Sequence, residues 1–153
     1  METQMLLRRL EDLAQLDTDA VQVYAEALEH VKDEDVRKEF ERFQGEHQYH
    51  ASTLSDTIVR LGGTKPDLKV DLMGRVADWV TAFRSMIGTK GPLHAMRTAE
   101  HYHNRRYGEA VEWDVGDEEV ATMLKRFDAD EKRHLAFVEE RLGDSAPAGG
   151  GAG

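Results

Sequence analysis

Four stretches of the sequence repeat apolar residues every three or four positions, and residues of the types that bind metals interrupt each repeat near its middle. Steps of three and four keep one face of a helix pointing in one direction, so the interrupting residues face inward together with the apolar ones. The chain is therefore predicted to be all-α, with a polar layer inside the core. The residues of that layer are Asp17, His47, His50, Glu100, His103, Glu131 and His134.

The positions of these residues along the helices predict that they meet at one level. If the first two helices form a hairpin that turns near Lys32, Asp17 and His47 each lie 15 residues from the turn. That separation is roughly 22 Å along either helix. In a second hairpin that turns near Val115, the two acids lie 15 and 16 residues from the turn. Docking of the two hairpins is thus expected to bring the polar residues into one site.

Glycine and proline punctuation, together with acidic residues at helix starts, divides the chain into five helices. The third has one apolar face and no candidate ligand, so we expect it to connect the two hairpins. We expect one bundle over residues 1–143 and a disordered Gly/Ala-rich tail over 144–153, which has too little apolar surface to fold. The predicted helices are 3–31, 34–62, 71–87, 92–114 and 117–142.

Composition limits both the cellular setting and the chemistry. With 153 residues, of which 40% are hydrophobic, the chain has the size of one domain with a sizeable core. The absence of cysteine excludes disulfides and thiolate metal sites, which leaves nitrogen and oxygen ligands. A net charge of −10 disfavours nucleic acid as a partner. Without an apolar run of about 20 residues or a signal-peptide pattern, we expect no membrane association and a cytoplasmic location.

An internal repeat relates the two predicted hairpins. In the first helix of each, an acid precedes a tyrosine by seven residues, and in the second, a phenylalanine precedes candidate ligands by four and by seven. His103 matches Ala20 in this alignment and is therefore an unpaired addition. The matched residues are Asp17, Tyr24, Phe43, His47 and His50 in the first hairpin, and Glu100, Tyr107, Phe127, Glu131 and His134 in the second.

Two interpretations of the polar layer are open. Acids are seldom fully buried without a partner, so three acids in one layer with four histidines favour a metal site. The alternative is a purely structural layer that fixes how the hairpins pack. Tyr24 and Tyr107 are expected to pack in the core, with hydroxyls that reach toward the layer.

This arrangement resembles the ferritin-like superfamily, which includes rubrerythrins and bacterioferritins, and implies a four-helix bundle of two hairpins joined by a short crossover helix. A closer resemblance, over roughly residues 5–142, is to a bacterial four-helix-bundle family filed as a domain of unknown function. The residues that carry it are Leu61-Gly62-Gly63-x-x-Pro66, Gly74, Arg75, Trp79, Phe83, Tyr107 and Glu131-x-x-His134.

The resemblance implies two iron ions held by Glu, Glu-x-x-His, Glu and Glu-x-x-His. Asp17 takes the first acid position and His50 the first histidine position. Glu100 takes the third-position acid, and Glu131 with His134 forms the final pair. His47 stands where a glutamate is expected. Because a neutral imidazole offers one lone pair, the substitution predicts the loss of one bridge between the ions.

The implied function is reaction with dioxygen or peroxide, in ferrous oxidation or in defence against oxidative stress. Zinc or manganese, or a single-metal site, are alternatives to two iron ions. A non-enzymatic helical protein that acts by association is the rival interpretation, and assembly into a homo-oligomer stays open.

Overall fold

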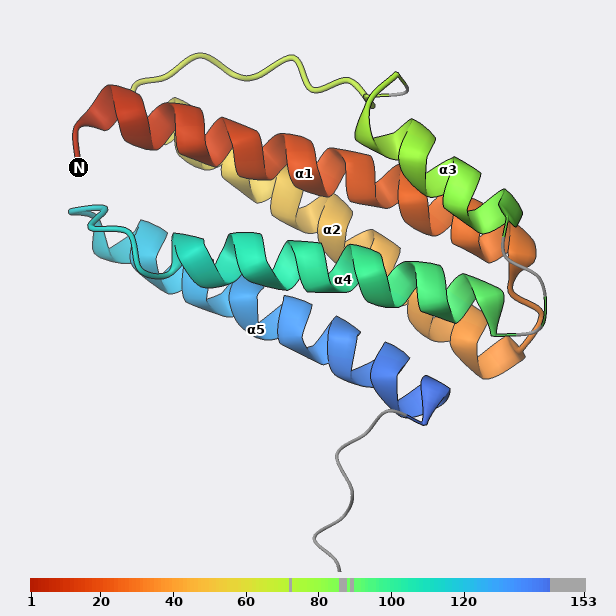
Figure 1. The fold of residues 1–153 in the computed structure, drawn as a ribbon. Helices are drawn as coiled ribbons and strands as arrows, with labels where there is room; N and C mark the ends of the chain where they lie inside the picture. Colours follow the sequence, from red (N-terminus) through yellow and green to blue (C-terminus); the bar gives the residue numbers. More distant parts are fainter. Residues whose placement is uncertain (72, 86–87, 89, 144–153) are drawn as a thin grey trace, which may run out of the picture.

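The computed structural model describes residues 1–71, 73–85, 88 and 90–143, and this part of the chain contains α-helices and no strand. The predicted tail lies outside these residues. Figure 1 shows α1 and α2 as one antiparallel hairpin and α4 and α5 as another, with α3 in the connection between them. This confirms the predicted all-α architecture of two hairpins and a crossover helix. The helices are α1 (Thr3–His30), α2 (Glu34–Arg60), α3 (Arg75–Ser85), α4 (Gly91–Ala110) and α5 (Glu118–Leu142).

Side chains that the sequence places at helix ends cap α2 and α5. The carboxylate of Asp33 accepts a hydrogen bond from the backbone N–H of Val36, and that of Asp117 accepts one from Val120, each at 3.0 Å. These bonds satisfy backbone donors that have no partner within the first turn. At the other end of α5, Gly143 adopts a φ of +78°, which favours glycine over any residue with a Cβ.

Two predicted boundaries are wrong by about four residues. The third helix begins at Arg75 instead of position 71, because the Asp71 carboxylate accepts a hydrogen bond from the backbone N–H of Gly74 and holds a turn there. The fourth helix ends at Ala110 instead of position 114. Beyond it, the backbone N–H of Trp113 donates a hydrogen bond to the carbonyl of Ala110. The chain therefore forms turns before Gly116, whose φ is +65°.

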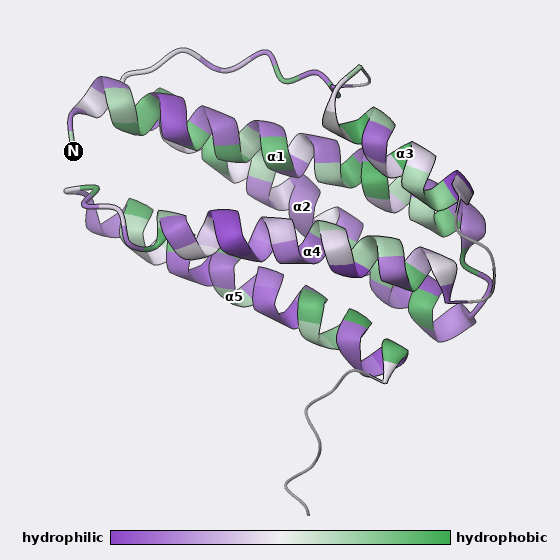
Figure 2. Cartoon of the chain, in the orientation of Figure 1, coloured by the Kyte–Doolittle hydropathy of each residue, from purple (hydrophilic) through white to green (hydrophobic). Residues whose placement is uncertain are grey.

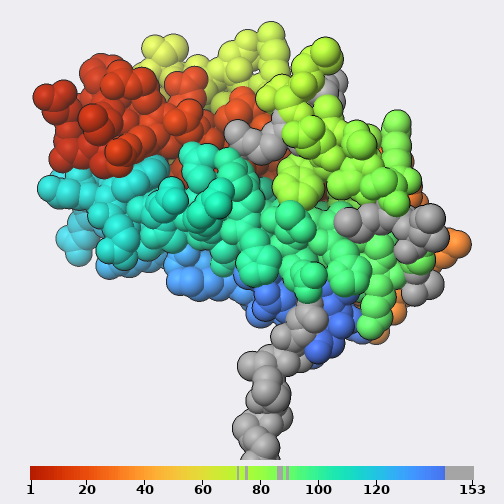
Figure 3. Space-filling view, in the orientation of Figure 1, coloured from red at the N-terminus to blue at the C-terminus, as the bar shows by residue number. Residues whose placement is uncertain are grey.

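The crossover between α2 and α4 runs the length of the bundle, so α4 begins at the end of the bundle where α1 ends and runs antiparallel to α1 (Figure 1). After α2 an extended segment follows the outside of α1 (Figure 1). It is anchored where Asp19 accepts from the backbone N–H of Asp71 at 2.9 Å and Gln15 donates to the carbonyl of Lys69 at 2.7 Å. Helix α3 then packs on α1 and α4 (Figure 3). The two hairpin turns consequently lie at opposite ends of the bundle.

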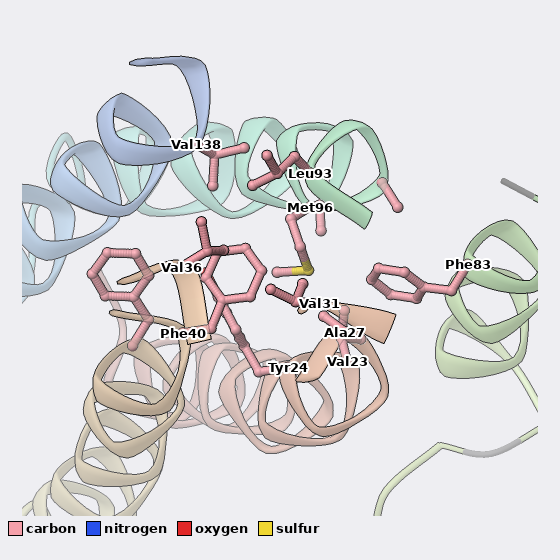
Figure 4. Close-up of a cluster of buried hydrophobic side chains, with 13 residues drawn as sticks. Val23, Tyr24, Ala27, Val31, Val36, Phe40, Phe83, Leu93, Met96 and Val138 are labelled. Atoms are coloured by element: carbon pink, nitrogen blue, oxygen red, sulfur yellow. The ribbon is translucent and has the colours of Figure 1, made fainter. Parts of the chain in front are cut away.

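The core consists of two apolar clusters with the polar layer between them. Hydrophobic residues recur along each helix among hydrophilic ones, as expected for amphipathic helices (Figure 2). One cluster fills the end near the α1–α2 turn, where Phe83 of α3 points toward Val23 and Ala27 of α1 (Figure 4). The second cluster, which includes Leu10, fills the end near the α4–α5 turn. Polar groups at the middle are therefore sealed from both ends.

None of the helices within the described residues has the length and hydropathy of a membrane span.

Candidate metal centre

The fold brings all seven predicted polar residues to one level in the middle of the bundle. They come from four helices: one from α1, two from α2, two from α4 and two from α5. Each is buried, with at most 5% of its side chain exposed. Hairpin turns at opposite ends do not disturb the layer, because each residue group lies near the midpoint of its helix.

The residues form two adjacent sets that share two members. The first set is Asp17, His47, His50 and Glu131, and the second is His47, Glu100, Glu131 and His134. Within each set, one nitrogen or oxygen atom from every residue lies within 4.8 Å of the others. His47 and Glu131 belong to both sets, while each hairpin supplies its own acid and histidine to one set.

Glu131 faces the two sets with different oxygens. Its Oε1 lies 3.5 Å from His47 Nδ1 and 3.6 Å from His50 Nδ1, on the side of the first set. Its Oε2 lies 3.7 Å from His134 Nδ1 and 3.8 Å from His103 Nδ1, on the side of the second. Such an orientation is what a carboxylate that bridges two cations requires.

Seven buried atoms of the layer have no hydrogen-bond partner among the described residues. Buried polar atoms in folded proteins are normally paired, and leaving one unpaired costs about 1–3 kcal/mol. Here the unpaired atoms are concentrated on the facing sides of the two sets, which is the arrangement of a cation site. They are His47 Nε2, His50 Nδ1, His103 Nδ1, His134 Nδ1, Glu100 Oε2, Glu131 Oε1 and Glu131 Oε2.

His103 stands beside the second set only. Its Nδ1 lies 3.8 Å from Glu100 Oε1 and 3.8 Å from Glu131 Oε2, and its side chain is buried. Its counterpart in the internal repeat, Ala20, has no ligand atom. The second set is therefore richer in nitrogen than the first.

Two carboxylates hold the outer nitrogens of two histidines. His134 Nε2 lies 2.6 Å from Glu46 Oε2, and His50 Nε2 lies 3.0 Å from Asp130 Oδ2. Arg133 donates to both carboxylates at 2.9 Å. With Nε2 occupied, each ring directs its free Nδ1 into the centre, a pairing that fixes ring orientation in histidine metal sites.

Glu46 and Asp130 are the functional residues that the sequence prediction missed. Each directly precedes a residue of the layer, His47 in α2 and Glu131 in α5, and so they match each other in the internal repeat. That match was available in the sequence. Both residues lie beside the inward face of their helix and are partly exposed. The sequence gave no sign that their side chains reach histidines of the opposite hairpin.

Tyrosine hydroxyls and phenylalanine rings complete the surroundings, again across the hairpins. Tyr24 donates to Glu100 Oε1 and Tyr107 donates to Asp17 Oδ2. The hydroxyls therefore reach the polar layer while the rings pack in the core, as predicted. Phe43 packs on the ring of His134 with centroids 4.2 Å apart, and Phe127 stacks on His50 at 3.9 Å.

The acids of the metal-free site remain ionised despite their burial. Burial alone would raise the pKa of Asp17, but the hydrogen bond from His47 and the nearby imidazole of His50 outweigh it and hold this pKa at about 2. Burial is likewise outweighed at Glu100, whose pKa is lowered by His103 and His47, and at Glu131, whose pKa is lowered chiefly by the charge of His47. The centre thus carries concentrated negative charge.

The same contacts favour protonated histidines when no cation is bound. Burial would lower the pKa of His50, but Asp17 and Glu131 raise it to about 9. The pKa of His47 is raised by Glu131 and Asp17 against the effect of burial, and that of His134 by Glu131 and Glu46. The positive charges of protonated histidines therefore balance the ionised carboxylates when no metal cation does so.

The fold and this buried layer define a ferritin-like helical bundle. The chain belongs to the family described as a domain of unknown function, DUF2383, whose model matches residues 5–113. Glu131 and His134 lie beyond the matched range. A comparison with curated proteins gives no match.

A solved structure with a similar fold is described as "ferritin like, diiron-carboxylate proteins from Bacillus anthracis str. Ames". The TM-score is 0.73 at 20% sequence identity, over 93% of this chain and 99% of that chain. This similarity establishes the ferritin-like fold over nearly the whole chain.

Proposed function

We propose that the chain binds two iron ions in this layer and reacts with dioxygen or peroxide, in ferrous oxidation or in defence against oxidative stress. The observation that carries the proposal is the convergence of seven nitrogen and oxygen atoms, without partners among the described residues, in and beside two adjacent sets of residues. Nitrogen and carboxylate donors without sulfur suit iron, manganese or zinc. Two sets that share ligands, and the diiron-carboxylate relative, favour two iron ions.

In this proposal each residue has a definite role. Asp17 and His50 hold the first ion, Glu100, His134 and His103 hold the second, and Glu131 and His47 are shared. Bound ferrous iron would supply electrons to the oxidant. The hydroxyls of Tyr24 and Tyr107 donate hydrogen bonds to Glu100 and Asp17 and so orient these acids. Glu46 and Asp130 keep a proton on the outer nitrogens of His134 and His50.

An oxidant can approach through a surface groove lined by residues of α2 and α5. Phe127 and Tyr49 line this groove, and Phe127 also stacks on His50. Phe127 thus lines the groove and also contacts a residue of the layer, so a small oxidant in the groove would come within one side chain of the centre.

The proposal is tested by anaerobic titration of metal-free protein with Fe(II), followed by exposure to oxygen. We expect two ions bound per chain. We also expect the bound ferrous iron to be oxidised faster than ferrous iron in buffer alone, as measured by absorbance. Binding no tighter than millimolar would rule the proposal out. The exposed His101 offers a control, since His101→Gln removes a histidine from α4 without touching the layer.

A structural role is the second candidate, because hydrogen bonds already join parts of the layer. His47 Nδ1 lies 2.7 Å from Asp17 Oδ1, and both tyrosines hold an acid. On that account the layer would fix the packing of the hairpins, and the protein would act by association. Unchanged melting curves with and without a chelator, in protein purified without added metal, would favour it.

A further inference from the structure

We infer that His47 bridges the two ions, binding one through Nδ1 and the other through Nε2. The inference rests on the proposed binding of two ions. It replaces the expectation that an imidazole at this position costs the site a bridge. His47 would instead take the part of the glutamate that occupies the matching position, Glu131, in the other half of the repeat.

The two ring nitrogens of His47 face different sets. Nδ1 lies 2.7 Å from Asp17 Oδ1 and 3.5 Å from Glu131 Oε1, which both belong to the first set. Nε2 lies 3.9 Å from Glu100 Oε1, which belongs to the second set only. The ring therefore lies between the sets as the Glu131 carboxylate does.

Among the residues that the structure describes, none outside the centre holds either nitrogen of His47. His50 and His134 each commit Nε2 to an outer carboxylate, which leaves a single nitrogen for a cation. In His47, Nε2 is buried without a partner among the described residues, and the hydrogen-bond partner of Nδ1, Asp17, is itself a candidate ligand. Both nitrogens are thus available to cations once Asp17 turns its oxygen to a cation.

A ring that bridges two cations through both nitrogens carries no N–H. The protons on the His47 ring therefore pass to solvent as the cations bind, and the ring becomes an imidazolate. This adds one negative charge to those of Asp17, Glu100 and Glu131 beside the two cations.

The rival arrangement keeps a proton on Nδ1. His47 would then donate to Asp17 and bind only the second ion through Nε2. The two arrangements differ in the number of ring nitrogens bound to metal, which nuclear magnetic resonance measures directly when the metal carries a nuclear spin.

The test is a spectrum of the full chain with ¹⁵N-labelled histidine rings, loaded with two equivalents of ¹¹³Cd(II). We expect both nitrogens of His47 to show coupling to cadmium, and His50 and His134 to show it at Nδ1 alone. His47→Gln assigns the ring, and the exposed His101 is the internal control without coupling. Coupling at a single His47 nitrogen, with coupling intact at His50 and His134, would overturn this inference but leave the proposed function standing. Absence of coupling at every histidine would overturn the proposed function with it.

Paired variants provide a second test that needs no assignment. His50→Ala removes a ligand of the first set only, and His134→Ala removes one of the second set only. We expect adding His47→Gln to weaken binding of the remaining Cd(II) about tenfold or more in both backgrounds, by calorimetry. A loss confined to the His50→Ala background would show that His47 serves the second ion alone. Circular dichroism of the metal-free variants checks that each is folded.

Discussion

The two hairpins supply nearly the same parts to the centre, and they differ at one shared position. Each brings an acid and a histidine for its own set, a tyrosine that holds the opposite acid, a phenylalanine that packs on the opposite histidine, and an outer carboxylate. The α4–α5 hairpin shares Glu131 between the sets, whereas the α1–α2 hairpin shares His47. His103 adds a nitrogen on the α4–α5 side only.

The contacts between the hairpins are the same in both halves of the repeat, whereas the residue type at the shared position differs. The interactions that cross between the hairpins are present in both halves, so that each half orients polar residues of the other. The shared position holds an imidazole in one half and a carboxylate in the other, and each presents two atoms toward the two sets. The symmetry of the site therefore lies in its contacts more than in its residue types.

Removing the shared carboxylate should have the largest effect. Glu131 faces both sets, so Glu131→Ala is expected to reduce metal binding from two ions per chain to none at micromolar concentration. Elemental analysis after equilibration with Fe(II) measures the content. Glu140→Ala, an exposed site on the same helix, is the matched control and should keep two ions. Retention of two ions by Glu131→Ala would show that the sets are not held together by this residue.

Metal removal should lower stability, because ions that bind only the native state stabilise it by mass action. At free metal 100 times the dissociation constant, each ion contributes about 2.7 kcal/mol. Two ions correspond to a shift in melting temperature of about 10 °C or more for a chain of this size. Differential scanning calorimetry with and without a chelator measures the shift, and superimposed curves would contradict it.

The outer carboxylates test whether the halves are equivalent. Glu46→Ala should weaken the second ion and Asp130→Ala the first, each by about 10- to 100-fold, because the freed ring loses the partner that orients it. Titration calorimetry that resolves two binding steps separates the effects. Weakening of the same step by both variants would mean that the halves do not act as separate ligand sets.

The pH dependence should differ between metal-free and loaded protein. In the metal-free state the pKa of His50 is raised from 6.5 to about 9, so its contribution to stability is present below pH 6.5 and is lost as the pH rises through 9. We expect the metal-free protein to lose on the order of 3 kcal/mol over this window. Loaded protein should not, because bound histidine carries no proton at the metal. Chemical denaturation at several pH values measures both, and His50→Gln should flatten the metal-free curve.

Making the two halves alike should change the metal content least. His47→Glu replaces one group that faces both sets with another, and a carboxylate carries the same single negative charge as an imidazolate. We expect two ions per chain, as in the unmodified protein, by elemental analysis. A fall to one ion would show that the space around position 47 accepts only the ring.

Much of the fold was predictable from local pattern. Apolar residues at steps of three and four marked every helix, and residues such as Asp33, Asp117 and Gly143 marked ends, because caps depend on neighbours along the chain. All seven layer residues were found in the same way, since burial in the middle of an amphipathic stripe depends only on spacing. The turns near Asp71 and Trp113 were missed because side-chain and backbone bonds outside the helical repeat decide them.

The sequence by itself determined that seven ionisable residues lie on the inward faces of four helices, halfway along each one. Tertiary structure decided which atoms meet. The crossover sets the second hairpin antiparallel to the first, and only that docking brings Glu46 to His134 and Asp130 to His50. It also decides that the nitrogens of His47 face different sets, because a ring's orientation follows from its contacts across the bundle, between residues far apart in sequence.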